Sequence, residues 1–492
     1  MQVELSLAPS SARRWHLELA LALAAVPGVE VAVRWDGADV RDRRLERLLA
    51  LERRRGAPGR SSPESTASFS GFEAGTDRSD LAISLSSLSP PARSRTWRLT
   101  FDAVEGVNAA LAAVVAGRTP LVRLVDSEGR TVAEARPGSE SPGVAEAAFD
   151  DLLAGCTTLI VQAVSGNELS LPTQDGVEDS VPVAPERRPS PLLVSAARMA
   201  VGSLARRGYH ALYRAPHWRV GWRYVDGADV VDLRAHPESG WTDLPDDGYH
   251  FYADPFPFVA EDRTFLFVED FDHRVGRGVI SVVEYDESGP LTAPTPVLQH
   301  DVHLSYPCVL EDEGEIWMVP ETSAAGTVEL YRAVGFPHRW RRERVLLRDL
   351  DASDATPFRH QGRWWLTATV RDGGSCSDAL YLWHADHLVG PWRPHARNPV
   401  LLDITSARPA GRVVHRDGRL FRPVQDGSGG YGRALAIAEV TRLDEGCFEQ
   451  RVVARLGTGP RWAGRRLHTL NRAGRLECID GSAMSPRVRR RA

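Results

Sequence analysis

The second half of the sequence repeats the same pattern five times. Each copy is about 50 residues long and opens with a short polar segment that ends in proline or threonine. The openings read YADPF, LSYPC, DATPF, ARPAG and LHT, around Asp254, Pro307, Pro357, Pro409 and Thr469. Each opening leads through a polar turn into an alternating strand. Short strands repeated at a fixed period predict a five-bladed β-propeller within residues 213–482.

The last of the five copies is shorter than the others. It supplies two strands, so its blade needs strands from elsewhere in the chain. We expect residues 218–231 to provide them, which would close the ring with both ends of the domain.

The first 167 residues alternate between strands and helices. Strands are predicted at 3–7, 29–35, 81–85 and 121–125, and helices at 11–25, 41–55 and 144–164. This rhythm is typical of an α/β layered domain, and we predict a Rossmann-like fold for residues 1–167.

Residues 168–190 are rich in Pro, Asp, Glu and Ser, which predicts a linker. Residues 191–212 are predicted to form an amphipathic connecting helix. That helix packs on the propeller or, in the alternative, makes peripheral membrane contact through residues 191–207. A disordered basic tail is expected over 483–492, and proteolysis in the linker is expected to separate two folded domains.

Composition excludes several classes of protein. The chain has 492 residues, 42% of them hydrophobic and 25% charged, with a net charge of -5, which is ordinary for a globular protein and not for a nucleic-acid binder. Five cysteines lie far apart, so we expect neither a disulfide framework nor a zinc site. Without a predicted signal peptide or membrane span, the expected location is cytoplasmic, with membrane association as an option.

Equivalent positions in propeller blades converge on one central mouth, and here they carry polar side chains. On the first strands these are Asp254, His303, Ser305, Tyr306, Asp354, Arg408 and His468, and on the second-strand ends Glu269, Asp270, Glu321, Arg371, Gln425 and Asp426. The set suits a polyhydroxylated or anionic ligand. The alternative is that these residues line a water-filled channel or cap strand ends.

Two of these carboxylates have apolar neighbours. Asp254 lies in an aromatic run, and Glu321 follows Met-Val-Pro. Desolvation beside such residues raises a carboxyl pKa and is typical of functional sites.

The motifs HFYADPF, HLSYP, VPETS, DATPF, ARPAG, RPVQD and LHTLN occur in this order across residues 248–481. As a set they resemble the N-terminal domain of plant glucosamine inositolphosphorylceramide transferases and its bacterial relatives. That domain is similar to the five-bladed propellers of arabinanases, levansucrases and invertases. In the plant proteins sugar transfer is attributed to a separate downstream domain, so the resemblance alone does not imply the reaction.

The resemblance to the hydrolase propellers implies roles for two carboxylates. Asp254 matches the first-blade base or nucleophile, and Asp354 matches the third-blade residue that orients substrate. The fourth-blade acid has no counterpart, because the sequence there reads Ala407-Arg408-Pro409. Hydrolysis needs an acid and a base, and Glu321 is the replacement acid that the sequence offers. The remaining residues would bind substrate, with Arg371 and Arg408 on phosphate or carboxylate groups.

We therefore predict a carbohydrate-active propeller that binds, and in the stronger version transfers, a sugar or sugar phosphate in glycan or glycolipid biosynthesis. The alternatives are a non-catalytic glycan-binding or scaffolding module and a glycosidase. No cofactor is expected. The segment from Glu269 to His273 has the DxD-type spacing of a divalent metal site, although an acidic turn explains it equally well.

The N-terminal half also carries a resemblance. DLAISLSS, WRLTFDAVEG and AGRTPLVRLVDSEG resemble the core of folate-dependent formyltransferases, which need an asparagine, a histidine and an aspartate. Asp102 lies near the expected site, but the one histidine of this half, His16, falls in a predicted helix. We expect this domain to be inactive, and no GxGxxG follows its first strand to indicate dinucleotide binding.

Overall fold

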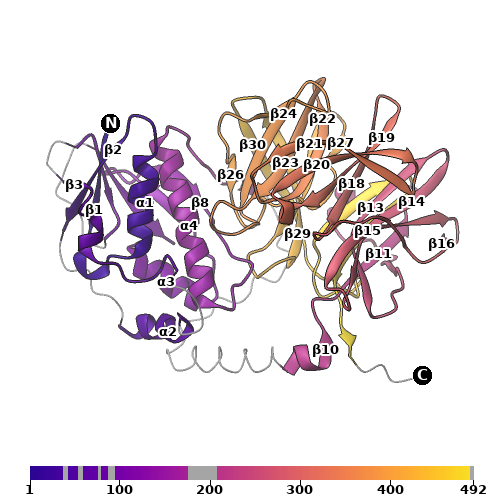
Figure 1. Cartoon of the computed structure of the whole chain (residues 1–492), viewed down its shortest axis with the longest axis horizontal. Helices are drawn as coiled ribbons and strands as arrows, with labels where there is room; N and C mark the ends of the chain where they lie inside the picture. The colour runs from indigo at the N-terminus through magenta and orange to yellow at the C-terminus, as the bar shows by residue number, and fades with distance from the viewer. Residues whose placement is uncertain (37–42, 54–58, 76–78, 87–94, 175–207, 488–492) are drawn as a thin grey trace.

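The computed structural model describes residues 1–492 apart from 37–42, 54–58, 76–78, 87–94, 175–207 and 488–492. Two domains lie side by side along the long axis of the molecule (Figure 1). The N-terminal one contains helices and a sheet, and the C-terminal one consists almost entirely of strands.

The N-terminal domain is built on a mixed sheet with the order β3-β2-β1-β4-β5-β7-β8. Its strands are β1 (Gln2–Leu7), β2 (Glu30–Trp35), β3 (Glu73–Ala74), β4 (Leu81–Ser84), β5 (Thr96–Phe101), β6 (Val104–Glu105), β7 (Val122–Val125) and β8 (Thr131–Ala135). The first five strands pair in parallel, whereas β6, β7 and β8 pair antiparallel. A mixed α/β sheet is therefore present, while the finer likeness to formyltransferases stays a prediction.

Four longer helices cover this sheet: α1 (Arg14–Ala24), α2 (Arg43–Arg53), α3 (Val107–Val115) and α4 (Ala145–Val164). The central one is α4, whose Phe149, Leu153 and Ile160 are fully buried. In the described part of the chain, α4 is the helix with the length and apolar composition to cross a membrane. Core helices of globular domains share that property, and α4 packs as one of them.

In the described part of the chain, five sheets of the C-terminal domain form blades, which confirms the five predicted blades. Blade one holds β13 (His250–Ala260), β14 (Arg263–Asp272), β15 (Arg277–Asp286), β16 (Gly289–Pro290) and β17 (Thr295–Leu298). Blade two holds β18 (Ser305–Asp312), β19 (Glu315–Thr322), β20 (Thr327–Gly335) and β21 (Arg339–Arg348). Blade three holds β22 (Ala352–His360), β23 (Arg363–Val370), β24 (Ala379–Ala385), β25 (Arg393–Pro394) and β26 (Leu401–Leu402).

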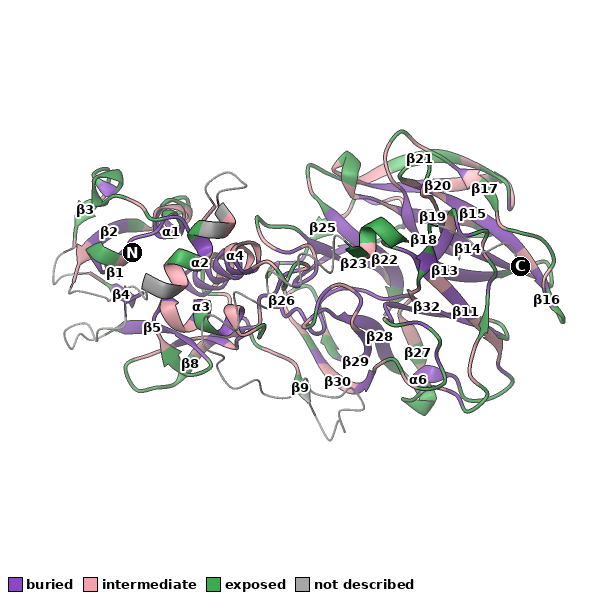
Figure 2. Ribbon diagram, turned by 90° about the horizontal axis from the view of Figure 1, so that it is seen from below, coloured by how far each residue is buried: buried purple, intermediate pink, exposed green. Residues whose placement is uncertain are grey.

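The last two blades draw on strands from distant parts of the chain. Blade four holds β27 (Val414–Arg416), β28 (Arg419–Asp426), β29 (Ala434–Leu443), β30 (Phe448–Leu456) and β9 (Thr173–Gln174), and blade five holds β11 (Trp218–Tyr224), β12 (Thr242–Asp243), β31 (Thr469–Ala473) and β32 (Leu476–Ser482). Because β11 pairs with β32 over its whole length, the ring closes between the two ends of the domain as predicted. Figure 2 shows the inner strands of the blades mostly buried, and outer strands such as β21 and many of the loops exposed.

Both predicted irregular segments are partly ordered. Within the predicted linker, Thr173 and Gln174 pair with β30, and residues 175–190 lie outside the described residues. Of the helix predicted at 191–212, residues 191–207 also lie outside them, and residues 208–212 are helical. The predicted tail begins with β33 (Ser485–Pro486), which pairs with β10 (Tyr213–Arg214). Its first residues are held by strand pairing that composition alone does not indicate.

The two domains touch along α4, the loop that follows β8 and the segment around Arg60. The Gln162 amide donates to the Asn398 carbonyl at 3.1 Å, and Arg60 Nη1 donates to the Gly373 carbonyl at 2.6 Å. Figure 1 shows α4 on the side of the sheet that faces the propeller. The linker is thus one of several connections between the domains.

Candidate functional site

Three first strands carry the same irregularity near the channel mouth. The register of β13, β18 and β22 shifts around Asp254, Tyr306 and Asp354. These three residues have φ values of 48°, 46° and 56°. Non-glycine residues rarely adopt positive φ, and bulges of this kind re-aim side chains next to functional sites. The repeat position that the sequence indicated is therefore a bulge that recurs in three blades.

Asp254 connects three blades. Its Oδ1 accepts from the Thr469 hydroxyl at 2.9 Å and its Oδ2 from the Tyr306 N–H at 3.2 Å. Its own N–H donates to Asp480 Oδ2 at 2.7 Å. Burial is the largest cause that raises the pKa of Asp254, to about 6. The charge of His468 acts to lower this pKa, and the charge of Asp480 acts to raise it.

His468 lies between Asp254 and Asp480. Its Nδ1 is 2.6 Å from Asp480 Oδ1, and its Nε2 is 3.4 Å from Asp254 Oδ1. Trp218 stacks on the imidazole with the ring centroids 4.4 Å apart. Burial disfavours the imidazolium, but the two carboxylates outweigh it and raise the pKa of His468. One group of the described residues has ligand atoms close enough to bind a single metal ion. It consists of Asp254, His468 and Asp480, whose ligand atoms lie within 4.8 Å of one another.

Asp354 forms a buried ion pair with Arg408. Arg408 Nε donates to Asp354 Oδ2 at 2.6 Å, and the Gln425 amide donates to the same oxygen at 3.2 Å. The Asp354 N–H donates to Glu321 Oε2 at 3.0 Å. Burial raises the pKa of Asp354 to about 8, even though the Arg408 charge acts in the opposite direction. The guanidinium carbon of Arg408 also lies 4.9 Å from the ring centroid of Tyr431.

A cavity of about 350 Å³ opens beside this ion pair. Its lining includes Glu321, Ser353, Arg371, Cys376, Arg408 and Tyr431. Of the three predicted catalytic carboxylates, Glu321 is the one that lines this cavity. It accepts a hydrogen bond from the Ser323 hydroxyl at 2.8 Å. Asp254, with 5% of its surface exposed, is not among the lining residues and lies deeper.

Glu269 and His303 lie at the blade-one side of the mouth. His303 Nε2 is 3.3 Å from Glu269 Oε1, and its Nδ1 accepts from the Gly278 N–H at 2.9 Å. Burial, followed by the charges of Asp254 and other carboxylates, raises the pKa of Glu269 well above its usual range. The predicted Ser305 lies opposite Glu321 in the strand register.

Tyr306 was predicted to contact ligand, but the structure places it in the floor of the mouth. It is fully buried, and its hydroxyl is 2.9 Å from the Thr356 hydroxyl and accepts from the Gly411 N–H at 2.8 Å. Below it, Arg412 crosses the channel and donates to the carbonyls of Pro257 and Val309, at 2.8 and 2.5 Å. These contacts close the channel beneath the mouth.

Two other predicted ligand contacts are engaged within the protein. Asp270 accepts from the Ser281 hydroxyl at 2.8 Å and pairs with His250 at 2.6 Å. Asp426 pairs with Arg455 at 3.0 Å. Successive residues of a strand face opposite sides, so at each second-strand end one residue of the pair turns away from its neighbour. The sequence did not indicate which of the two would face the mouth.

The predicted DxD-type metal segment does not converge on one point. Asp272 binds Arg274 at 2.8 Å, and His273 Nε2 lies 3.1 Å from His217 Nδ1. Asp270 and Asp272 also share a protein partner, His250, whose ring nitrogens lie 2.6 and 3.6 Å from their carboxylate oxygens, so these carboxylates are engaged by side chains of the protein.

The sequence interpretation missed several residues of the mouth: Asp480, Tyr431, Cys376 and Trp218. Asp480 ends the second strand of blade five, where Glu269 and Glu321 end theirs, so the same rule applied to the fifth blade would have found it. Tyr431 and Cys376 lie on loops outside the repeat pattern, and no signal in the sequence marks them.

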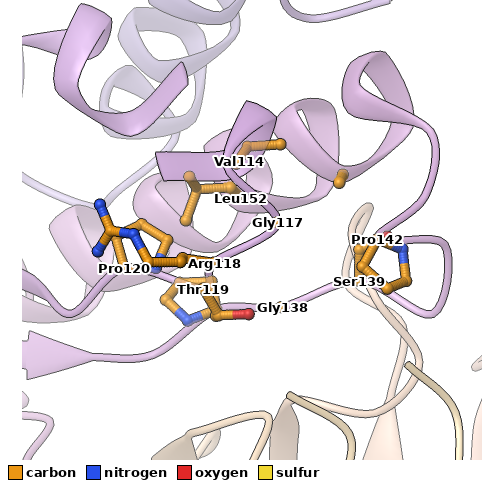
Figure 3. Close-up of a pocket in the computed structure, with 11 residues that line it drawn as sticks. Val114, Gly117, Arg118, Thr119, Pro120, Gly138, Ser139, Pro142 and Leu152 are labelled. Carbon is orange, nitrogen blue, oxygen red and sulfur yellow. The ribbon is translucent and has the colours of Figure 1, made fainter. Parts of the chain in front are cut away.

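The predicted residues of the N-terminal domain have structural contacts. His16 Nδ1 accepts from the Arg13 N–H at 2.9 Å, and Asp102 binds Arg118 at 2.5 Å and the Leu121 N–H at 2.9 Å. A pocket between the end of α3, α4 and the loop after β8 has a volume of about 20 Å³ (Figure 3). That is room for about one water molecule.

Comparisons with known proteins agree with the resemblance predicted for the propeller. Residues 242–478 match the family model described as Glucosamine inositolphosphorylceramide transferase 1, N-terminal. The protein of that name from Oryza sativa subsp. japonica is 34% identical over 233 residues, which are 45% of this chain and 31% of the rice protein. The Arabidopsis thaliana protein is 32% identical over 234 residues, 46% of this chain and 30% of its own length. The chain thus spans less than a third of the length of these relatives.

Two solved glycoside hydrolases are also similar. A thermostable family-43 glycoside hydrolase is 12% identical, with a TM-score of 0.34, over 43% of this chain and 81% of its own. A GH43_1 enzyme from Xanthomonas citri is 13% identical, with a TM-score of 0.35, over 49% of this chain and 88% of its own. The assignment of five blades rests on the five sheets themselves.

Proposed function

We propose that the mouth of the propeller binds a sugar or sugar phosphate in glycan or glycolipid biosynthesis. The observation that carries this proposal is the cavity of about 350 Å³, where Glu321, Arg371 and Arg408 lie beside Tyr431. Carboxylates accept hydrogen bonds from sugar hydroxyls, arginines bind phosphate, and an aromatic ring packs against the apolar face of a sugar.

The names of the relatives support a narrower ligand class. They contain glucosamine and inositol phosphate, a hexosamine and a phosphorylated polyol. A ring amine fits the three carboxylates near Arg408, which belong to Asp254, Glu321 and Asp354. The charge of Glu321 helps to raise the pKa values of Asp254 and Asp354. Arg371 is exposed on the cavity wall and suits a phosphate group.

Binding without turnover is the version that the geometry favours. Both carboxylate oxygens of Asp254 already accept hydrogen bonds from the protein, and Arg408 occupies the place of the fourth-blade acid. Transfer, with Asp254 as base or nucleophile, Glu321 as acid and Asp354 as orienting group, is the second candidate. It is supported by the raised pKa of about 6 at Asp254, which suits a group that exchanges protons near neutral pH. A glycosidase is the third.

Two further parts of this proposal concern the rest of the chain. The protein would act in the cytoplasm, in contact with membranes where its glycolipid substrates lie. The N-terminal domain would be a formyltransferase-like domain without formyl transfer, because His16 and Asp102 are both held in structural contacts.

Calorimetric titration with glucosamine, glucose 1-phosphate and inositol 1-phosphate tests the proposal. At least one of them should bind the full chain, and Arg371→Ala should weaken the phosphorylated ligands about tenfold, the loss expected for one charge-assisted contact. Arg344→Ala, an exposed arginine on β21, is the matched control and should change nothing. Absence of binding by all three, or equal binding by both variants, would refute a sugar-phosphate mouth.

A further inference from the structure

The loop of residues 136–144 carries the N-terminal domain to the rim of the propeller mouth. Arg136 donates its N–H to the Leu402 carbonyl and accepts from the Ile404 N–H, both at 2.9 Å. A Cβ atom added at Gly138 would lie 2.3 Å from Ile404 Cγ1, so the approach requires glycine. The loop is therefore packed against blade three by backbone contacts.

Glu140 extends from this loop to a segment of blade three. Its Oε1 accepts from the Ser375 hydroxyl at 2.5 Å and from the Cys376 N–H at 3.0 Å, and Cys376 Sγ lies 3.4 Å away. Burial raises the pKa of Glu140, but hydrogen bonds from Ser375 and Ser377 and the Arg408 charge outweigh it and lower that pKa. Glu140 is thus a carboxylate anion that holds three consecutive residues of the propeller.

The segment that Glu140 holds is part of the mouth. Arg408 Nη1 donates to Cys376 Sγ at 3.4 Å and to the Ser377 hydroxyl at 3.2 Å, while its Nε binds Asp354. Cys376 and Arg408 both line the cavity of about 350 Å³. A continuous set of contacts therefore runs from the N-terminal domain through Glu140 to Arg408.

We propose that the N-terminal domain is a structural part of the ligand site, and that Glu140 is a positioning residue that fixes the wall formed by Ser375, Cys376 and Arg408. This inference rests on the proposed function of the mouth as a sugar or sugar-phosphate site. It gives the N-terminal domain a role that needs no chemistry of its own: the domain shapes the cavity at blade three.

Ordinary domain docking is the competing explanation, and the interface offers a control for it. Gln162 also joins the domains, through Asn398, but neither residue lines the cavity. If Glu140 only docks the domains, Gln162→Ala and Glu140→Gln should have the same effect on the mouth. If Glu140 positions the wall, only Glu140→Gln should disturb it.

The test uses Cys376 as a reporter in the full chain. The rate of its alkylation by iodoacetamide is measured by mass spectrometry, with Cys447 on blade four as the internal standard. Glu140→Gln should raise this rate about fivefold or more, because the loop loosens and the nearby anion is removed. Ser375→Ala keeps the Glu140 charge while removing one hydrogen bond, so it separates positioning from electrostatics and should also raise the rate. Gln162→Ala should leave it within about twofold.

Binding of glucose 1-phosphate to the same variants completes the experiment. We expect about a tenfold weaker affinity for Glu140→Gln and wild-type affinity for Gln162→Ala. Three results would overturn the positioning role. The alkylation rate of Cys376 is unchanged in both Glu140→Gln and Ser375→Ala, it increases in Glu140→Gln alone, or it increases equally in Gln162→Ala. If the wild type binds no sugar phosphate, the proposed function fails, while the alkylation rates still decide whether Glu140 fixes the wall.

Discussion

At the scale of single residues, the mouth contains buried titratable groups that shift one another's pKa values. Asp254, Glu269, Asp354 and His468 all have raised pKa values, with burial as the largest cause for the three carboxyls and neighbouring carboxylates as the cause for His468. The aromatic run around Asp254 predicted such desolvation correctly. The sequence did not indicate that Asp254 would also tie three blades together, because those partners come from distant repeats.

Asp254→Asn tests whether this residue acts chemically or structurally. The amide can still accept from the Tyr306 N–H and donate to the Thr469 hydroxyl, so we expect a loss of stability of about 1–2 kcal/mol rather than unfolding. If the mouth turns over a substrate, the variant should bind it and form no product. Thermal unfolding and product analysis measure both, and an unfolded variant would assign Asp254 to the scaffold alone.

These raised pKa values predict how the free energy of unfolding depends on pH. An acid whose folded pKa is raised keeps its proton in the folded state after the unfolded chain has released it, so stability falls as pH rises between the two values. With Asp254 raised from 3.8 to about 6 and Asp354 from 3.8 to about 8, the free energy of unfolding should decrease from about pH 4 to about pH 8. Denaturant unfolding of wild type and Asp254→Asn checks this, and the variant should lose part of the slope below about pH 6. An increase in stability with pH across this range would contradict the assignment.

At the scale of elements, repeated bulges and a closed floor make the mouth. The sequence predicted the five blades, the ring closure and the principal helices, because their periodicities are strong. It missed β5 and β8, and it missed α3, which is apolar on nearly all sides and has no clear helical stripe. It also missed the role of Tyr306, since the repeat gives a residue's position along a strand and not the direction its side chain takes after a bulge.

Arg412→Ala tests the floor. The side chain is a buried cation whose hydrogen bonds join Pro257 of blade one to Val309 of blade two, and burial lowers its pKa. Removing it should leave two carbonyls without their donor and lower the free energy of unfolding by about 2–3 kcal/mol. Arg341→Ala, an exposed arginine on β21, should change it by less than about 0.5 kcal/mol. Equal stability of the two variants would show that Arg412 does not hold the blades together.

At the scale of the whole molecule, the domains share an interface that could not be predicted from local sequence patterns. Composition identified a linker, and from it two separable domains were expected. The structure adds contacts from Arg60, Arg136, Glu140 and Gln162 to the propeller. These contacts join residues more than 200 positions apart, and no local pattern encodes such a pairing.

Proteolysis tests the interface directly. Cleavage between residues 175 and 190 should give two folded fragments that still migrate together in size-exclusion chromatography, because the interface lies elsewhere. Glu140→Gln combined with Gln162→Ala should weaken that association. Fragments that separate at once from the wild-type chain would mean that the linker alone joins the domains.

A crystal structure of the full chain, soaked with glucosamine and with glucose 1-phosphate, tests directly whether the propeller mouth is a carbohydrate site. We predict density for a sugar in the cavity beside Glu321, Arg371 and Tyr431, with the phosphate against Arg371. Density at another place on the molecule, or an empty cavity at saturating ligand concentration, would contradict it.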